Sequence, residues 1–386
     1  MAVEFLPGNL LTLLRSGLEY FPELEAAIRG AEREIYLETY IYADDATGRR
    51  ISHALCEAAS RGVAVHVLVD GFGSREMLKS LAPGLSEAGV RLLVFRPGTL
   101  SEAFRRDRLM RMHRKLAVAD ARVAFVGGIN VIDDMDTPHQ VPPRYDYAVR
   151  VEGPLLAPIH DAVVRLWNRV AWRRGRHAWR VSHPLTPEAA RKGDQRAAFV
   201  ARDNFRHRRD IEEAYLEAID SARQEIVVAC AYFFPGRRFR RALTGAAARG
   251  VRVALLLQGR VEYLLLRYAS RALYGTFLEA GVEIYEYHKS FMHAKVAVVD
   301  GHWATVGSSN IDPFSLLLAR EANVVVEDRG FAARLRSLLR ADMERGARVV
   351  AKEGWFAQPL WRRIPIWLGY GLARFTIGMF GFSGRF

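Results

Sequence analysis

Two copies of one short motif hold the residues of this chain that are best suited to chemistry. Both copies follow the pattern His-x-Lys-x4-Asp with an Asn 17 positions after the His, and they begin 180 positions apart. Their members are His113, Lys115, Asp120 and Asn130 in the first copy, and His293, Lys295, Asp300 and Asn310 in the second. A duplicated set of this kind predicts two half-sites that work as a pair.

The residue types in the motifs suit a phosphate diester. One imidazole can attack phosphorus while the other protonates the departing alkoxide. The two ammonium groups and the Asn amides, with the hydroxyl of Ser308, can neutralise the phosphate oxygens. The chain uses 50 Arg and only 6 Lys, yet two of the Lys share one motif position, which indicates that the site needs a compact ammonium group. With lysines in this place and no carboxylate cluster or Cys/His ligand set in the sequence, we expect no metal and no other cofactor.

Four acids accompany the two motifs. A nucleophilic imidazole needs a partner on its other N–H, and Asp146 and Glu321 lie 33 and 28 residues after the respective His. We assign these two acids to orienting the histidines. Asp120 and Asp300 count with the catalytic residues of the motif, but both follow the motif strand at a turn, where we expect them to hold the backbone.

The elements around the motifs repeat as well. Residues 61–69 match residues 249–257, and an Ala-rich helical stretch precedes each of them. His113 and Lys115 are two positions apart, so they leave the same face of a strand. Each half reads strand, helix, strand, helix, strand, motif hairpin and closing strand. We therefore predict an α/β fold of two sandwiches related by a pseudo-twofold axis, with mixed, mostly parallel sheets and one shared active site at the interface.

The predicted boundaries follow from this repeat. The first half covers residues 1–182, a polar linker with two prolines covers 183–197, and the second half covers 198–345. Residues 346–386 form a basic and aromatic C-terminal tail. The N-terminus has no basic region ahead of an apolar one, so we do not expect a signal peptide.

Composition limits the class of partner. Half of the 386 residues are hydrophobic, which indicates a folded protein, and the net charge of +13 points to nucleic acid, an anionic lipid surface or a phosphorylated substrate. Cys56 and Cys230 stand in apolar stretches and are expected to be thiols in a reducing compartment. The sequence leaves the oligomeric state open.

Two segments have the composition of a membrane contact. The stretch 165–180 is rich in Arg and Trp, and the tail from 364 to 384 has Arg374 as its only charged residue. The predicted lipid-contacting residues are Arg169, Trp172, Arg173, Arg174, Trp361 and Trp367. For the tail an interfacial anchor is favoured, with a tail packed on the domain or a true membrane span as alternatives, because five glycines, Pro365 and Arg374 interrupt the apolar run.

These residues resemble the phospholipase D superfamily, whose hallmark is the duplicated HxKx4D motif. Four further segments are similar to bacterial cardiolipin synthases, and most of all to their short B-type, which lacks the N-terminal membrane helices of the major enzyme. These are YIYAD (40–44), DYAVRVEGP (146–154), AYFFPG (231–236) and WATVGSSNIDP (303–313). One departure is that Gly128 stands where the second half has Ser308.

The resemblance implies a phosphatidyltransferase that makes cardiolipin from two phosphatidylglycerols. One His, by family habit that of the first motif, takes the phosphatidyl group as a covalent phosphohistidine and releases glycerol. The other His then deprotonates the hydroxyl of the second lipid. Lys115, Lys295, Asn130 and Asn310, with Ser308 added, become phosphate ligands. A lipid substrate further implies an enzyme peripheral to the cell membrane on its cytoplasmic face.

Three other interpretations stay open at this stage. The same two motifs serve superfamily nucleases, but both halves in one chain and an aromatic tail favour lipid, so no nucleic acid is expected. A lipid hydrolase, or transfer to another alcohol such as headgroup exchange on phosphatidylethanolamine, differs in how the pocket treats water and acceptor. A non-catalytic membrane scaffold would not need every motif position to be present.

Overall fold

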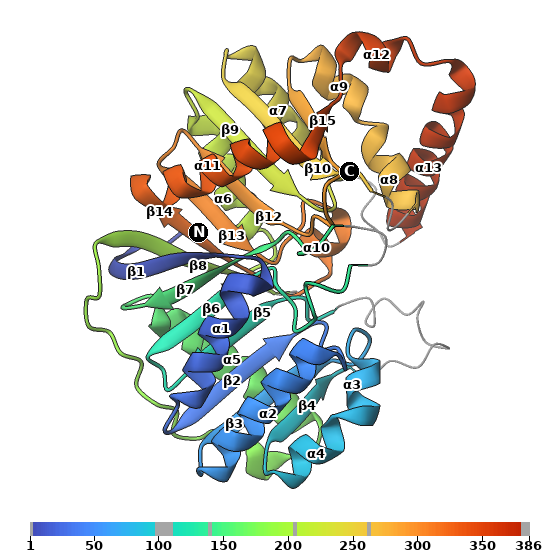
Figure 1. Ribbon diagram of the computed structural model, residues 1–386. Coiled ribbons are helices and arrows are strands. Elements are labelled where there is room, and N and C mark those ends of the chain that lie inside the picture. The colour runs from blue at the N-terminus through green and yellow to red at the C-terminus, as the bar shows by residue number, and fades with distance from the viewer. Residues whose placement is uncertain (1–2, 97–110, 138–140, 204–206, 261–263, 380–386) are drawn as a thin grey trace.

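The computed structural model describes residues 3–96, 111–137, 141–203, 207–260 and 264–379. Within these residues both halves build one 15-stranded sheet, with helices on both of its faces (Figure 1). The strand order is β15-β11-β10-β9-β12-β13-β14-β8-β1-β7-β6-β5-β2-β3-β4. This confirms the predicted α/β class.

The first half begins with a strand and a helix that the repeat did not predict, and then follows the predicted order. Its elements are β1 (Leu6–Arg15), α1 (Ser16–Arg29), β2 (Glu34–Thr39), α2 (Ala46–Ser60), β3 (Ala64–Asp70), α3 (Arg75–Ser80), α4 (Ala82–Glu87), β4 (Arg91–Phe95), β5 (Lys115–Ala119), β6 (Val123–Gly127), β7 (Tyr147–Glu152), α5 (Leu156–Arg173) and a 3-10 turn (His177–Trp179).

The second half repeats this order and adds a C-terminal extension. Its elements are β8 (Gln195–Arg202), α6 (Asp210–Ser221), β9 (Glu225–Cys230), α7 (Arg237–Ala248), β10 (Arg252–Gln258), α8 (Leu264–Arg271), α9 (Tyr274–Glu279), β11 (Glu283–Tyr287), β12 (Lys295–Val299), β13 (Trp303–Gly307), α10 (Pro313–Leu317), β14 (Glu321–Glu327), α11 (Arg329–Gly346), β15 (Ala347–Val349), α12 (Lys352–Phe356) and α13 (Leu360–Met379).

The expectation of mostly parallel sheets was wrong. Only β2, β3 and β4 in the first half and β9, β10 and β11 in the second pair in parallel, while the other neighbouring strands of the described sheet are antiparallel. The physical reason lies in the connections. Helical crossovers join the parallel strands, whereas the motif hairpins turn within a few residues, and such short turns join antiparallel strands.

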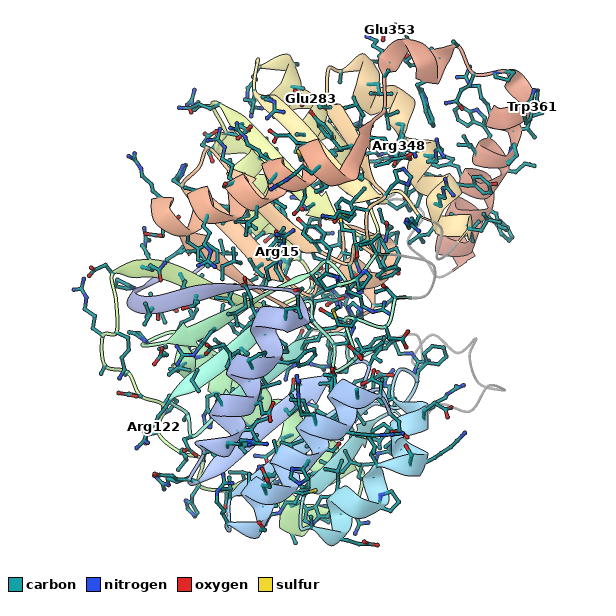
Figure 2. The ribbon with its side chains drawn as sticks, in the orientation of Figure 1. Arg15, Arg122, Glu283, Arg348, Glu353 and Trp361 are labelled. Carbon is teal, nitrogen blue, oxygen red and sulfur yellow. The ribbon has the colours of Figure 1, made fainter. Side chains whose placement is uncertain are left out.

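The two halves also share one sheet instead of forming separate sandwiches. Strand β1 pairs with β7 of its own half on one side and with β8 of the other half on the other. At the same junction Arg15, labelled in Figure 2, donates to the carboxylate of Asp342 on α11 at 2.8 Å. Backbone pairing through β1 and the ion pair of Arg15 with Asp342 therefore join the two halves.

Alternation along the strands explains the layers. On β2, Ile35 and Leu37 pack with α1 and α2 on one face of the sheet, whereas Tyr36 packs on the opposite face with residues of α5. The core on that second face is continuous between the halves, because it contains side chains of both α5 and α11. Since both faces are covered there, β2 and β9 are buried along their whole length.

The C-terminal tail is partly built into the second half. Strand β15 pairs with β11, and Trp355, Ile366 and Ala373 lie buried in the core of the second half. Helix α13 packs beside α8 (Figure 1), and a side chain added at Gly369 would lie 2.6 Å from the Tyr268 Cβ. Within the residues that the structure describes, no helix has both the length and the apolar character needed to cross a bilayer.

Candidate active site

Four backbone hydrogen bonds between the halves assemble the site. The segment before the first motif pairs with the segment before β14: His113 N donates to Arg320 O at 2.9 Å, and Arg320 N donates to Arg111 O at 2.8 Å. The segment before the second motif pairs in the same way with the segment before β7. There His293 N donates to Tyr145 O at 2.7 Å, and Tyr145 N donates to Phe291 O at 2.9 Å. His113 therefore lies beside the residue that follows Arg320, and His293 lies beside the residue that follows Tyr145.

The residue beside His113 is Glu321. The Nδ1 atom of His113 lies 3.0 Å from Oε1 and 3.1 Å from Oε2 of this carboxylate. Burial by itself raises the pKa of Glu321, but the facing His113 and Lys115 outweigh it, and the pKa lies below its usual value. The acid is thus ionised and accepts the Nδ1–H of the imidazole.

The residue beside His293 is Asp146. Its Oδ2 atom lies 2.7 Å from Nδ1 of His293 and 3.5 Å from Nζ of Lys295. Burial opposes ionisation here as well, but Lys295 and His293 together hold the pKa of Asp146 below its usual value. Both acids that we assigned to orienting a His therefore contact one, but each contacts the His of the opposite half.

Both imidazoles are neutral. Burial lowers the pKa of His113, partly opposed by Glu321, and burial together with Lys295 lowers the pKa of His293 to about 3. The side chains of the two histidines keep 16 % and 17 % of their surface exposed, whereas the Glu321 side chain has none. With Nδ1–H given to a carboxylate, Nε2 is left as the unprotonated nitrogen of each ring.

The two lysines connect the two half-sites electrostatically. Lys115 and Lys295 are buried, and each donates to the carbonyl of its own motif His. Burial lowers the pKa of both lysines, that of Lys115 to about 7. The charge of Lys295 also lowers the pKa of His113, and that of Lys115 lowers the pKa of His293, so the two half-sites lie within electrostatic reach of each other.

The two Asn side chains are held by the loops that follow β2 and β9. The Oδ1 atom of Asn130 accepts from Ile41 N at 3.1 Å, and that of Asn310 accepts from Tyr232 N at 3.4 Å. Because the amide oxygen serves the backbone in both halves, the NH2 group is the end of each side chain that can bind an anion.

The structure corrects the expected role of Ser308. Its hydroxyl, fully buried, donates to Glu321 Oε2 and accepts from Ala322 N at 3.0 Å, so it holds the acid instead of a phosphate. The first half has no counterpart because a Cβ at Gly128 would lie 2.4 Å from Oδ1 of Asp146. Asp146 therefore packs directly against Gly128, whereas Glu321 accepts a hydrogen bond from the Ser308 hydroxyl.

Asp120 and Asp300 do not belong with the catalytic residues. Asp120 accepts from the N–H groups of residues 32–34 at 2.8–2.9 Å, and Asp300 accepts from those of residues 223–225 at the same distances. Each lies seven residues from its motif His along an extended strand, which is about 23 Å. Both acids fix the start of the neighbouring strand, which is the turn-holding role that their position suggested.

Three aromatic rings near the histidines were not assigned from the sequence. The Tyr40 ring centroid lies 5.0 Å from that of His113 and 5.5 Å from Lys115 Nζ. Phe291 stacks on His293 at 6.2 Å, and Tyr232 meets the same imidazole at 6.4 Å. Two signals in the sequence pointed to them: Phe291 is two residues before His293, and Tyr40 and Tyr232 lie in the segments 40–44 and 231–236 that resemble cardiolipin synthases.

The predicted lipid-contacting residues lie on the surface of both halves. Trp172, Trp361 and Trp367 expose 58–65 % of their surface, and Arg169 and Arg173 are exposed. Arg174 is engaged within the fold, because it donates to Val94 O from Nε at 3.2 Å and Nη2 at 2.9 Å. Figure 2 shows Trp361 pointing outward from α13. No group of three or more potential His, Cys, Asp or Glu metal ligands occurs in the described part of the chain.

Comparison with known proteins gives matches over most of the chain. The sequence profile described as "Cardiolipin synthase, PLD-like domain" matches residues 24–135 and 215–343. Cardiolipin synthase B of Escherichia coli (strain K12) is 41 % identical over 339 residues, which cover 88 % of this chain and 81 % of that protein. The major cardiolipin synthase ClsA of Bacillus subtilis (strain 168) is 30 % identical over 370 residues, covering 93 % and 74 %.

Solved structures match the fold at low sequence identity. The phosphatidylserine synthase of Haemophilus influenzae Rd KW20 superposes with a TM-score of 0.71 at 15 % identity, covering 99 % of this chain and 97 % of that one. The polyphosphate kinase of Porphyromonas gingivalis gives a TM-score of 0.58 at 16 % identity, covering 89 % and 49 %. At these identities the two matches describe the fold alone.

Proposed function

Because this chain belongs to the phospholipase D-like cardiolipin synthase family, we propose that His113 and His293 transfer a phosphatidyl group between two lipids by way of a phosphohistidine. The chain is a phosphatidyltransferase that makes cardiolipin, as its similarity to the B-type synthases indicates. The substrates are phospholipids, and two phosphatidylglycerols account for a product with two phosphatidyl groups on one glycerol.

In the first step the lone pair on His113 Nε2 attacks phosphorus of one phosphatidylglycerol. The bond from phosphorus to the headgroup glycerol breaks, and His293 gives its Nε2 proton to the departing oxygen. Burial first, and then the charge of Lys295, lower the pKa of His293, and the negative charge of the substrate phosphate beside Lys115 and Lys295 offsets the second of these causes. Substrate binding therefore supplies the condition under which His293 can carry a proton.

In the second step a terminal hydroxyl of another phosphatidylglycerol gives its proton to His293 Nε2. Its oxygen attacks phosphorus, the bond from phosphorus to His113 Nε2 breaks, and cardiolipin leaves. Two phosphatidylglycerols thus give one cardiolipin and one glycerol. The buried ammonium groups of Lys115 and Lys295 and the NH2 groups of Asn130 and Asn310 stabilise the charge on the phosphate oxygens in both steps.

One observation carries this proposal, namely the crossed pairing of the histidines and acids. His113 bonds to Glu321 and His293 to Asp146, so neither motif His finds its carboxylate partner in its own half. A protein that used the halves separately would have no reason to share them in this way. The crossed pairs also draw both imidazoles to the junction of the halves, which supports a single phosphorus atom shared between them.

The exposed face of α13 supports docking on a membrane. Six large apolar side chains on this helix are each more than half exposed and follow one another at spacings of one to four residues: Trp361, Ile364, Trp367, Leu368, Leu372 and Phe375. The opposite face, with Ile366 and Ala373, packs on the second half. The tail is therefore packed on one side and open on the other, which suits a helix lying in the membrane interface.

Other exposed apolar side chains lie near the same edge of the sheet. Phe72 follows the carboxyl end of β3. The exposed Trp172 lies at the end of α5, and a hydrogen bond from Arg174 joins this end to the carboxyl end of β4. His113 lies beside the Tyr40 ring that follows β2 of the same parallel set. We place the membrane at this edge, beside the motif histidines, where anionic headgroups would attract a protein with a net charge of +13. The free thiols Cys56 and Cys230 suit the cytoplasmic face.

Product analysis tests the function. The purified protein is incubated with vesicles of phosphatidylglycerol, and lipids and free glycerol are measured by mass spectrometry. We expect cardiolipin and glycerol in equal amounts, and a loss of at least about a hundredfold in His113→Ala and in His293→Ala. Phosphatidic acid as the main product would indicate a hydrolase, and cardiolipin formation that survives both substitutions would refute the roles of the histidines.

A further inference from the structure

A basic pocket lies directly beside His293 in the second half. Its walls come from the ends of β9 and β10 and from α8, and it encloses about 460 Å³ including its open mouth. Tyr232, which lines it, contacts the His293 ring at 6.4 Å, and Gln258 in its wall donates to Met292 O at 3.1 Å. The pocket is therefore separated from the imidazole of His293 by one layer of side chains.

The charge of the pocket suits an anion. Arg260, Arg267 and Arg271 line it, and Glu286 is the one acid among the described residues of its wall. Arg271 already has partners within the fold, because it lies 3.7 Å from Glu286 and over the ring of Trp355. Arg260 donates to His288 O at 2.8 Å through Nε. Arg267 is half-buried on α8, and the structure gives it no ion pair among the described residues, so its guanidinium is the group best able to bind a ligand.

The matching position in the first half has the opposite electrostatic character. The carboxyl end of β3 holds Asp70, which accepts from Met112 N at 3.0 Å, just as Gln258 at the end of β10 contacts Met292. Arg111 lies 3.8 Å from Asp70 and so faces a buried carboxylate. A phosphate near the end of β3 would meet this carboxylate, whereas a phosphate near the end of β10 meets a neutral amide.

Cardiolipin formation needs a place for a second phosphate. The acceptor lipid carries its own phosphate, and only one glycerol separates it from the phosphorus under attack. The pocket is one side chain, Tyr232, away from the His293 imidazole, and Arg267 in its wall has no ion pair among the described residues. Its apolar wall, which includes Leu257 and Leu266, continues to α8, whose Leu264 and Leu265 are exposed beside α13.

We propose that this pocket, with Arg267 and Arg260, binds the phosphate of the acceptor lipid while that lipid's terminal hydroxyl lies at His293. The inference rests on the proposed function. It also assigns the histidines, because the entering oxygen must approach phosphorus opposite the bond that breaks. An acceptor on the side of His293 makes this residue the base and leaves His113 as the nucleophile.

The test compares three acceptors with phosphatidylglycerol vesicles as donor. Vesicle phosphatidylglycerol has a phosphate and acyl chains, soluble glycerophosphoglycerol has the phosphate alone, and deuterated glycerol has neither. We expect the wild type to prefer glycerophosphoglycerol to glycerol. Arg267→Gln removes one charge-assisted contact and should therefore lower that preference about tenfold. The ratio of cardiolipin to exchanged glycerol should fall by the same factor. Arg267→Lys should restore part of it.

The control is Arg334→Gln, which removes one charge from an exposed position on α11 and should leave all three rates unchanged. Equal loss with all three acceptors in Arg267→Gln would mean that the pocket holds the donor, and it would overturn the inference. So would an unchanged preference. If the wild type prefers glycerophosphoglycerol and loses this preference in Arg267→Gln, yet forms no cardiolipin, the proposed function fails while the phosphate pocket stands.

Discussion

The crossed pairing predicts that each acid controls the His of the other half. In Glu321→Gln the side chain keeps its shape, and its oxygen can still accept from His113 Nδ1, but the negative charge is lost. In the wild type, Nδ1 of His113 lies 3.0 and 3.1 Å from the two carboxylate oxygens of Glu321. A hydrogen bond to a charged group contributes about 1.5–3 kcal/mol, which corresponds to a loss of roughly ten- to a hundredfold in kcat/KM.

Titration of the imidazoles separates this account from a same-half pairing. Glu321 raises the pKa of His113 relative to burial alone, so Glu321→Gln should lower the pKa of His113 further and change His293 little. Asp146→Asn should act on His293 in the same way. Side-chain nitrogen NMR of protein labelled at His measures both. The reasoning is refuted if Glu321→Gln moves the pKa of His293 while that of His113 stays constant.

Four further predictions follow from the site. Ser308→Ala should lower kcat/KM about tenfold by releasing Glu321, and a larger loss in KM than in kcat would instead support the phosphate-binding role. Because the pKa of His113 is lowered, this nucleophile stays neutral as the pH falls through 6.5, and the acid limb of the kcat/KM profile should lie below pH 6.5. Above pH about 7, kcat/KM should fall again because Lys115 of the free enzyme loses its proton. Asp300→Asn should lower the melting temperature by several degrees with nearly normal kcat/KM at 25 °C, and equal loss of both would place it in the site. Leu368→Glu should weaken binding to anionic vesicles in a flotation assay without changing the circular dichroism spectrum, and unchanged flotation would contradict docking through α13.

The repeat in the sequence was sufficient to predict the order of elements and the family. Residues 61–69 and 249–257 became β3 and β10 in equivalent places, and the two motifs became equivalent hairpins. Strands β1 and β8 were not predicted, because nothing in the motifs indicates how the halves join. Periodicity also does not distinguish a buried parallel strand from a buried antiparallel one, which is why the sheet was expected to be mostly parallel.

The candidate site was predictable in its members and not in its pairing. Both acids were selected by their distance from a His, but the partner of each depends on backbone bridges such as Met112 to Arg320, which join residues 208 positions apart. The hydrogen bond from Ser308 to Glu321 was not predicted, because the buried carboxylate comes from the strand β14, which pairs with the strand that ends just before Ser308. The pocket at Arg267 could not be predicted, since one Arg among 50 carries no signal in the sequence.

The most direct test of the central claim is a crystal structure of the enzyme with vanadate, which adopts the geometry of a phosphate under attack. The account predicts a vanadium atom bonded to Nε2 of His113, with the opposite apical oxygen within hydrogen-bond distance of Nε2 of His293 and the equatorial oxygens near Lys115 and Lys295. Vanadate bonded to His293 would reverse the assignment of nucleophile and base. Vanadate bound by one half alone, with the other imidazole out of reach, would contradict a single shared site.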